Sequence, residues 1–379
     1  MVMQLPNETL HAIFENLSPS SLTVVARASY RFHLVAERVL YTSIVIQESL
    51  PRDAPTPRHT HNCASTLLSR PHLAEVVRKF SIRWQTDMGP RDAYLPAVAS
   101  ALHALNAALR TLMTLEQLDL ALGLAGTPLD AHAVLNGCAF PALRVFALSG
   151  VGRGALSPKL YQGSTTSASL SWFLAHSPTI STLHLLDSYE PLTLPPAALP
   201  HLQVFRGSAI AAAGVLPGRP VRLLGLVGHE FITERDLERI ARSRSPIRRL
   251  DLSLMSVTPL LLRDISRHLG AAVEVLKVKL ALRHTLHFAL SGISLLAGLS
   301  PVLGAFPSLQ QLDLSPTSVD GVGRGNALEE SALCTTWARA CPALRHVVFP
   351  SRAEWRRGGG APDVWVADAG AGATVWTRH

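Results

Sequence analysis

The stretch FPSLQQLDL, residues 306–314, contains the pattern that decides the fold. An apolar residue is followed after two residues by a second apolar residue, and after one more residue by a third. FPALRVFAL at 140–148 and CPALRHVVF at 341–349 repeat it. The proline before the first apolar position ends a preceding helix and favours extended backbone. The pattern therefore predicts a helix, a short strand and then the same pair again.

The apolar triplet recurs along most of the chain at intervals of about 19 to about 38 residues. The triplets are Val77-Phe80-Ile82, Leu115-Leu118-Leu120, Leu143-Phe146-Leu148, Ile180-Leu183-Leu185, a partial Leu202-Phe205, Val221-Leu224-Leu226, Ile247-Leu250-Leu252, Val273-Leu276-Val278, Leu309-Leu312-Leu314 and Leu344-Val347-Phe349. One such unit cannot bury its own apolar side chains, so the units must stack into a solenoid. The pattern resembles a degenerate leucine-rich repeat, which implies an α/β solenoid with a parallel sheet on its concave face.

Side chains alternate between the two faces of a strand, so the residues between the apolar positions should point to the concave face. Of the polar residues predicted there, ten are candidates for partner binding: Gln117, Asp119, His184, Arg206, Arg249, Asp251, Lys277, Lys279, Gln311 and Asp313. Two interpretations remain open. The row is either a partner-binding face or simply the side of the sheet that must face water.

The first 46 residues have a different pattern, that of short amphipathic helices. Leu10, Ile13, Phe14 and Leu17 share one helical face after Pro6, and Ser18 to Ser20 interrupt the helix. A second apolar helix follows, then a third from about 31 to 41, and YTSIVI (41–46) alternates like a strand. A module this small cannot cover all of its apolar side chains alone.

This N-terminal pattern resembles the F-box, in a form common among fungal proteins. The matching residues are Leu5-Pro6, Glu8, Leu10, Ile13-Phe14, Leu17, Arg31-Phe32, Ala36 and Leu40-Tyr41. Phe32 stands where many relatives carry tryptophan. The resemblance implies binding to a Skp-type adaptor and, through it, to a cullin scaffold. The residues expected at that interface are Leu5, Pro6, Glu8, Leu10, Ile13, Phe14, Leu17, Leu22 and Phe32.

The predicted organisation has four parts. They are an adaptor-binding module at 1–46, a proline-rich linker at 47–63, the repeats at 64–350 and a tail at 351–379. The tail contains Trp355, Trp365 and Trp376. It is expected either to form a hairpin that closes the last repeat or to fold back over the concave face.

Composition excludes few functions. The 379 residues are 47% hydrophobic and 16% charged, with a net charge of +8. The positive charge is mostly scattered arginine, which indicates compositional drift more than a nucleic-acid partner. Four cysteines without a CxxC pair suggest reduced thiols and a cytoplasmic or nuclear protein. The uncharged run 288–306 has the length of a membrane span, but its serines, glycines and Pro301 favour a buried helix, and no membrane is expected.

No catalytic or ligand motif is complete. GVGRGNALEE at 321–330 lacks the lysine of a phosphate loop, and HTLH at 284–287 lacks an acidic partner. His59, His61 and Cys63 do not have zinc-site spacing. Neither an enzyme nor a cofactor or metal is therefore expected. The leading hypothesis is a substrate receptor of an SCF-type ubiquitin ligase. The alternative is a repeat scaffold outside any ligase, whose N-terminal helices cap the solenoid.

Overall fold

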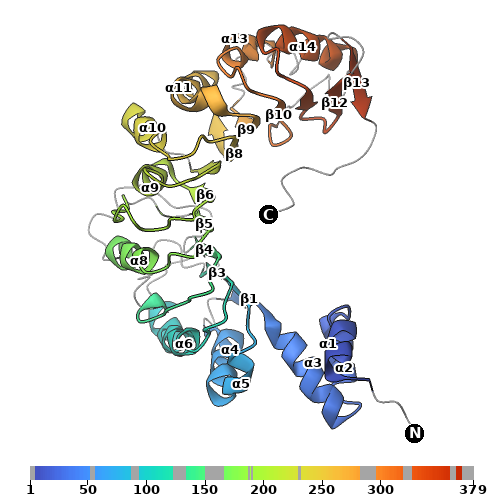
Figure 1. Ribbon diagram of the computed structural model, residues 1–379, viewed down its shortest axis with the longest axis vertical. Coiled ribbons are helices and arrows are strands. Elements are labelled where there is room, and N and C mark those ends of the chain that lie inside the picture. Colours follow the sequence, from blue (N-terminus) through green and yellow to red (C-terminus); the bar gives the residue numbers. More distant parts are fainter. Residues whose placement is uncertain are drawn as a thin grey trace. The chain divides into compact units, whose positions relative to one another are not determined.

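Each apolar triplet ends in a short strand, and helices lie on one side of the strands (Figure 1). The computed structural model describes residues 5–51, 56–86, 94–122, 134–149, 166–186, 188, 191–228, 232–281, 296–318, 327–358 and 364–368. The chain divides into two units, Met1–His201 and Leu202–His379, and each is described by itself.

The first unit begins with three helices and continues with strands that pair in chain order. Its elements are α1 (Asn7–Phe14), α2 (Pro19–Val25), α3 (Tyr30–Thr42), β1 (Ser43–Leu50), α4 (Arg58–Ser69), α5 (Pro71–Ala74), β2 (Lys79–Thr86), α6 (Tyr94–Leu109), β3 (Gln117–Ala121), β4 (Val145–Ser149), α8 (Thr166–Ala175) and β5 (Thr182–Leu185). Strands β1 to β5 are parallel, each to the next. The predicted fold class, a helical module followed by a parallel sheet, is confirmed.

The second unit repeats the same arrangement and ends in a hairpin. Its elements are β6 (Val204–Gly207), α9 (Ala209–Val215), β7 (Leu223–Val227), α10 (Glu234–Ile240), β8 (Arg249–Val257), α11 (Pro259–Leu269), η2 (Gly270–Ala272), β9 (Val275–Leu280), η3 (Ala297–Leu299), α13 (Ser300–Leu303), β10 (Gln311–Asp313), α14 (Ala327–Ala340), β11 (His346–Val348), β12 (Glu354–Arg357) and β13 (Trp365–Asp368). Strands β6 to β11 are parallel.

The triplet residues form the core. All of them are buried except Leu148, which is half-buried. The strand register places equivalent positions opposite one another, as Phe80, Leu118 and Phe146 show in the first unit. The prediction that the triplets mark successive strands of a stacked repeat is therefore confirmed.

Strand β1 joins the N-terminal helices to the repeats. It pairs in parallel with β2 over its whole length, from Ser43 opposite Lys79 to Leu50 opposite Thr86. Buried Glu48 accepts hydrogen bonds from the backbone N–H groups of His59 (2.8 Å) and Thr60 (3.2 Å) at the start of α4, and from the Thr60 hydroxyl (3.1 Å). A carboxylate at a helix N-terminus is favourable because the free N–H groups point toward it.

This contact corrects the expectation of a linker at 47–63. Residues 47–50 belong to β1 and residues 58–63 to α4. The prolines suggested a loop, but the hydrogen bonds of the buried Glu48 carboxylate connect the end of β1 to the start of α4.

The tail forms a hairpin in its described part. Strands β12 and β13 are antiparallel to each other, and β12 is antiparallel to β11. Trp355 and Trp365 are buried, and Trp355 Nε1 donates to Glu330 Oε2 at 2.8 Å. This hairpin pairs residues 354–357 with 365–368, whereas Trp376 lies outside the described part of the chain.

Some sequence features fall partly or wholly outside the described residues. Residues 288–295 of the uncharged run lie outside, and its remaining part forms the short elements η3 and α13. Among the described residues, none of the helices is long and apolar enough to span a membrane. HTLH at 284–287 and residues 321–326 also lie outside the described ranges.

Glu48→Ala should lower the free energy of unfolding by about 2–3 kcal/mol, because it leaves buried N–H groups and a hydroxyl without an acceptor. The exposed Glu75 provides the control, since Glu75→Ala should change stability by less than about 0.5 kcal/mol. Urea unfolding of the full chain measures both. Equal effects of the two substitutions would contradict the role given to Glu48.

The cysteines should resist alkylation in the folded protein. Cys63, Cys138, Cys334 and Cys341 are free thiols, and burial raises the pKa of Cys63 and of Cys138 to about 11. Since the thiolate is the reactive form, little of it exists at pH 8. Iodoacetamide labelling followed by mass spectrometry should be slow at pH 8, accelerate toward pH 10, and reach completion only after unfolding. Rapid labelling of native Cys138 at pH 8 would be inconsistent with this structure.

Candidate protein-interaction sites

Helices α1–α3, called the N-terminal module below, have a small core of their own. Its buried residues are Leu10, Phe14, Leu22, Val35 and Ala36. The rings of Phe14 and Phe32 pack edge to face with centroids 5.7 Å apart. Ser18 caps α2 and Ser29 caps α3, each accepting a hydrogen bond from a backbone N–H three residues later.

This core changes the expected adaptor interface. Leu10, Phe14 and Leu22 are buried inside the N-terminal module, so they hold it together and do not offer a surface to a partner. Leu17 and Phe32 are half-buried beside them. Adaptor contact was expected of all nine residues, and the structure gives the three buried ones a role in the core of the module.

The other predicted interface residues lie on the surface of the N-terminal module. Leu5 is 50% exposed and Ile13 is 46% exposed, and Pro6 and Glu8 are also exposed. Exposed aliphatic side chains on short helices are what a hydrophobic interface core requires. These residues remain candidates for adaptor contact.

Three further exposed apolar residues were not predicted: Val24, Tyr30 and Leu34. Val24 lies two residues after buried Leu22, which places it on the opposite side of α2. That spacing was readable in the sequence. Together with Leu5 and Ile13 these residues are called the exposed apolar set.

Arg31 fixes the segment that precedes α1. Its Nε donates to Asn7 Oδ1 at 2.8 Å, and its Nη2 donates to the backbone carbonyl of Leu5. The start of α3 is thus tied to Leu5 and Pro6, and two charge-assisted hydrogen bonds hold this pair in place.

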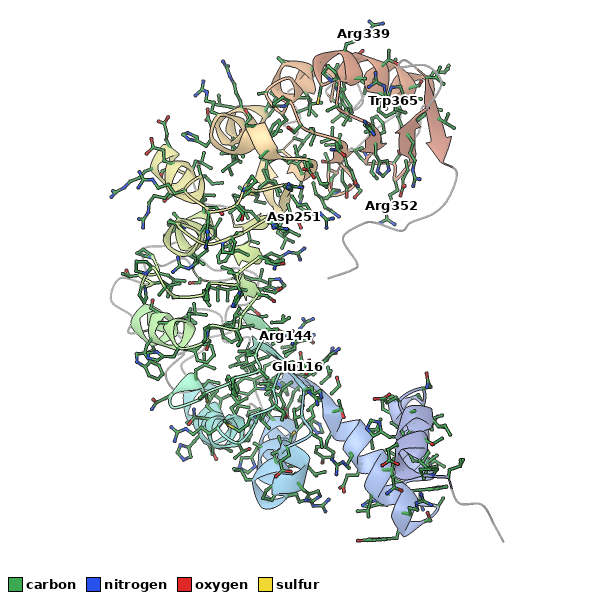
Figure 2. All side chains as sticks on the ribbon, in the orientation of Figure 1. Glu116, Arg144, Asp251, Arg339, Arg352 and Trp365 are labelled. Atoms are coloured by element: carbon green, nitrogen blue, oxygen red, sulfur yellow. The ribbon has the colours of Figure 1, made fainter. Side chains whose placement is uncertain are left out.

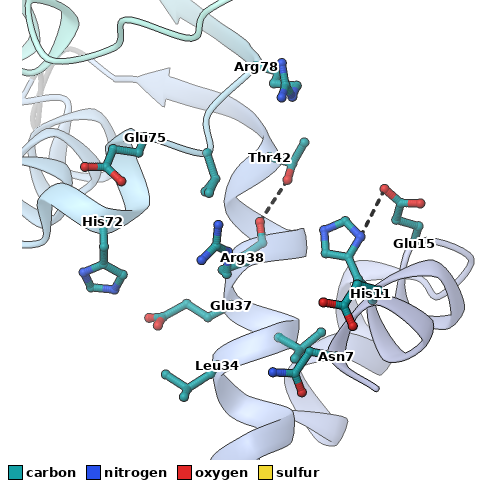
Figure 3. Close-up of a pocket in the computed structure, with 13 residues that line it drawn as sticks. Asn7, His11, Glu15, Leu34, Glu37, Arg38, Thr42, His72, Glu75 and Arg78 are labelled. Atoms are coloured by element: carbon teal, nitrogen blue, oxygen red, sulfur yellow. Dashed lines mark hydrogen bonds and ion pairs between the residues drawn. The ribbon is translucent and has the colours of Figure 1, made fainter. Parts of the chain in front are cut away.

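A hollow of about 900 Å³ is lined by residues of α1, of α3 and of the segment 72–78 (Figure 3). Its lining residues are Asn7, Glu8, His11, Glu15, Leu34, Val35, Glu37, Arg38, Thr42, His72, Glu75, Val76 and Arg78. At its edges His11 lies 3.5 Å from Glu15, and Glu37 forms a 2.6 Å ion pair with Arg70. Among the described residues, helices α1 and α2 pack mainly against α3.

In the first unit the strand register aligns two of the predicted polar residues across the sheet. Asp119 is opposite Ala147, which is opposite His184, so the two polar residues occupy one row across three strands. The Ser81 hydroxyl donates to Asp119 Oδ2 at 3.3 Å. Gln117, Asp119 and His184 are all half-buried.

In the second unit the corresponding row is a ladder of alternating charge. Arg206 Nη2 is 3.4 Å from Asp251 Oδ2, and Lys277 Nζ is 3.2 Å from Asp313 Oδ2. Figure 2 shows Asp251 on the strand side of this unit. The remaining predicted residues of this unit, Arg249, Lys279 and Gln311, are half-buried on the same face.

The two carboxylates of this ladder correct a prediction. Asp251 and Asp313 were expected to face solvent, but both are buried. Each also accepts a hydrogen bond from a backbone N–H two residues later, from Ser253 (3.0 Å) and from Ser315 (2.9 Å). Burying a carboxylate is unfavourable unless it is paired and hydrogen-bonded, and both conditions are met here.

Gly225 makes room for the first pair of the ladder. It lies opposite both Arg206 and Asp251 in the register, and a Cβ atom there would be 2.7 Å from Arg206 Cγ. Because glycine has no side chain, Arg206 crosses the strand between them and reaches Asp251. No spacing rule in the sequence predicts this contact.

Within the described ranges, no group of three or more His, Cys, Asp or Glu side chains is arranged as metal ligands would be. The interaction surfaces are therefore the exposed apolar set on the N-terminal module and the polar strand faces of the two units. Exposed apolar side chains on short helices and rows of polar side chains on a sheet are typical of surfaces that bind other proteins.

Comparison with known proteins agrees with the N-terminal pattern. The F-box-like family matches residues 2–47, so the chain contains an F-box-like domain, a kind of domain that typically binds Skp-type adaptors. No curated protein matches the sequence. Among solved structures, the leucine-rich repeat-containing protein LegL7 from Legionella pneumophila is similar at 16% identity, with a TM-score of 0.39, over 84% of this chain and 95% of that chain. A similarity this low has no bearing on function.

Phe14→Ala and Ile13→Ala should separate core from surface in the N-terminal module. Removing the buried Phe14 ring should cost about 3–5 kcal/mol, whereas truncating exposed Ile13 should cost less than about 0.5 kcal/mol. Hydrogen exchange of the backbone amides in α1–α3 reports both effects. If Ile13→Ala accelerated exchange as much as Phe14→Ala, the division between core and surface would be wrong.

Proposed function

We propose that the protein is the substrate-receptor subunit of an SCF-type ubiquitin ligase. The N-terminal module binds a Skp-type adaptor and, through it, a cullin scaffold, and the repeats bind a target protein. The observation that carries the proposal is the exposed apolar set on a module that already has its own core. Apolar side chains left exposed by a folded module are available to a partner.

Covering the exposed apolar set would contribute to the stability of a complex. Fully burying an exposed apolar side chain contributes about 1.5–3 kcal/mol, and these side chains are 43–79% exposed, so each contributes a fraction of that amount. The entropy lost on association offsets part of the sum.

The hollow beside α1 favours this proposal over the cap alternative. A cap would need the apolar side chains of α1 and α2 packed on the repeats. Instead Ile13 is exposed, and α1 faces the first repeat across polar residues such as His11 and Glu75. This arrangement supports adaptor binding by the N-terminal module.

The repeats provide the second half of the function. Their strand faces carry polar side chains held in rows by the register, a rigid surface on which a protein can be recognised. The chain performs no covalent step in this mechanism. It raises the effective concentration of the target's lysines near the ubiquitin-conjugating enzyme. The complex would act in the cytoplasm or the nucleus, where such adaptors operate.

The test is capture of a purified Skp-type adaptor by the full chain. The double variant Leu5→Asp, Ile13→Asp should weaken binding at least about 100-fold, since it places two charges in an apolar interface. The matched control is Leu260→Asp, Leu328→Asp, which makes the same change at exposed positions on α11 and α14. Phe14 is left unchanged because it belongs to the core of the module.

Affinities measured by isothermal titration calorimetry decide the outcome, with circular dichroism to verify that the variants fold. Unchanged adaptor binding by the Leu5, Ile13 variant, or no binding by the unmodified chain, would refute the proposal. Weakened binding by the control as well would mean that the effect is not specific to the N-terminal module.

A further inference from the structure

Two neighbouring loops of the second unit are rich in arginine and contain no acidic residue. The first loop, 216–222, connects α9 to β7, and the second, 241–248, connects α10 to β8. Their arginines, called the arginine cluster below, are Arg219, Arg222, Arg242, Arg244 and Arg248. Neither loop contains a lysine. The concentration of one residue type here contrasts with the scattered arginines of the rest of the chain.

Backbone hydrogen bonds hold the two loops side by side. Gly218 N–H donates to the carbonyl of Arg242 at 3.0 Å, and Arg244 N–H donates to the carbonyl of Arg219 at 2.9 Å. Arg248 N–H donates to the carbonyl of Arg222, also at 2.9 Å. Gly218 has a φ of +77°, a left-handed turn that favours glycine. The arginines are therefore near one another because of the fold and not merely in the sequence.

The charges of the cluster are only partly neutralised. Arg248 forms a 3.4 Å ion pair with Glu274. Arg219 is buried, and its Nη1 donates to the carbonyls of Val215 (2.5 Å) and Pro217 (3.1 Å).

The other three arginines, Arg222, Arg242 and Arg244, are exposed, and none makes an ion pair with a residue in the described ranges. Holding like charges together disfavours the folded state, so an anion bound here would relieve a repulsion that is already present.

The cluster extends along the edge of the sheet where the parallel strands begin. Residues that directly precede the parallel strands β7 to β11, and the last residue of the antiparallel strand β12, are linked by successive backbone hydrogen bonds of 2.8–2.9 Å. Their order is Arg222, Arg248, Glu274, Gln310, Arg345 and Arg357. With strands about 4.8 Å apart, this row is about 24 Å long. An extended peptide of about seven residues has that length.

We propose that this edge of the second unit binds an acidic peptide segment of the target protein. The inference rests on the proposed function, in which the repeats recognise a target. Guanidinium groups form paired hydrogen bonds with carboxylates and lose little solvation on doing so, which suits arginine to this ligand better than lysine. Glu274, which follows Arg248 in the row, would fix the position of the bound peptide along the edge, because a peptide carboxylate opposite Glu274 is disfavoured.

A nucleic acid fits this edge less well. Single strands are held by aromatic side chains that stack on bases, and neither the two loops nor the strand-start row contains an aromatic residue. Glu274 within the row would also repel a continuous phosphate backbone. The acidic peptide is therefore the partner that the chemistry favours.

The test uses the full chain and fluorescently labelled synthetic probes. One probe is a twelve-residue peptide containing six Asp or Glu residues, and the second replaces these with Asn and Gln. The acidic peptide should bind at least tenfold more tightly than the neutral one, and its affinity should fall as salt is raised from 50 to 300 mM. A twelve-nucleotide single-stranded DNA is the third probe.

The variant Arg222→Gln, Arg242→Gln, Arg244→Gln should reduce binding of the acidic peptide at least tenfold. The matched control Arg235→Gln, Arg263→Gln, Arg267→Gln removes the same charge from exposed positions on α10 and α11 and should bind normally. Equal binding of the two peptides would overturn the proposal. So would equal loss in both variants, or tighter binding of the DNA.

Adaptor capture, measured on the same variants, keeps the two proposals distinct. Equal binding of the acidic and neutral peptides by the unmodified chain, with normal adaptor capture, refutes only the inference about the arginine cluster. Failed adaptor capture by the unmodified chain, with selective peptide binding retained, refutes only the ligase role.

Discussion

Within each unit, hydrogen bonding of each strand to the next one along the chain is the constraint on which the structure depends. A repeat with one strand and one helix has three apolar side chains to bury and too little surface to do so. Parallel pairing stacks the equivalent positions, so Leu250 lies opposite Leu276 and Leu276 opposite Leu312. The same backbone pairing also determines which face of the sheet each polar strand residue occupies, including the residues proposed to recognise a target.

Much of this fold could be predicted because its signals are local. Proline before the first apolar residue ends a helix, and alternation within the next few residues specifies which side chains turn inward. The linker was misread for the opposite reason. The burial of Glu48 depends on the N–H groups of His59 and Thr60, eleven and twelve residues away. No periodicity encodes a contact between a strand carboxylate and the start of a later helix.

The candidate sites were predicted less completely. Helical spacing identified one apolar face in α1, but it could not divide that face between the module's own core and a partner. Phe14 fell on the inner side and Ile13 on the outer side, although they are adjacent. In the sheet, alternation gave the direction of Asp251 and Asp313 correctly. The burial of Asp313 depends on Lys277 in the neighbouring strand. The burial of Asp251 depends on Arg206, two strands away, and on the missing side chain of Gly225 between them.

The pairing of β1 with β2 also determines how the chain can be divided. A cut after residue 46, where the F-box resemblance ends, would pass through the middle of β1 and leave the backbone of Lys79 to Ile82 without its neighbour. Unpaired strand edges recruit strands from other molecules and promote aggregation. Repeats shortened in this way would precipitate for reasons unrelated to ubiquitin. Single substitutions at exposed positions of the N-terminal helices are therefore better suited than truncation to testing the N-terminal module and the repeats separately.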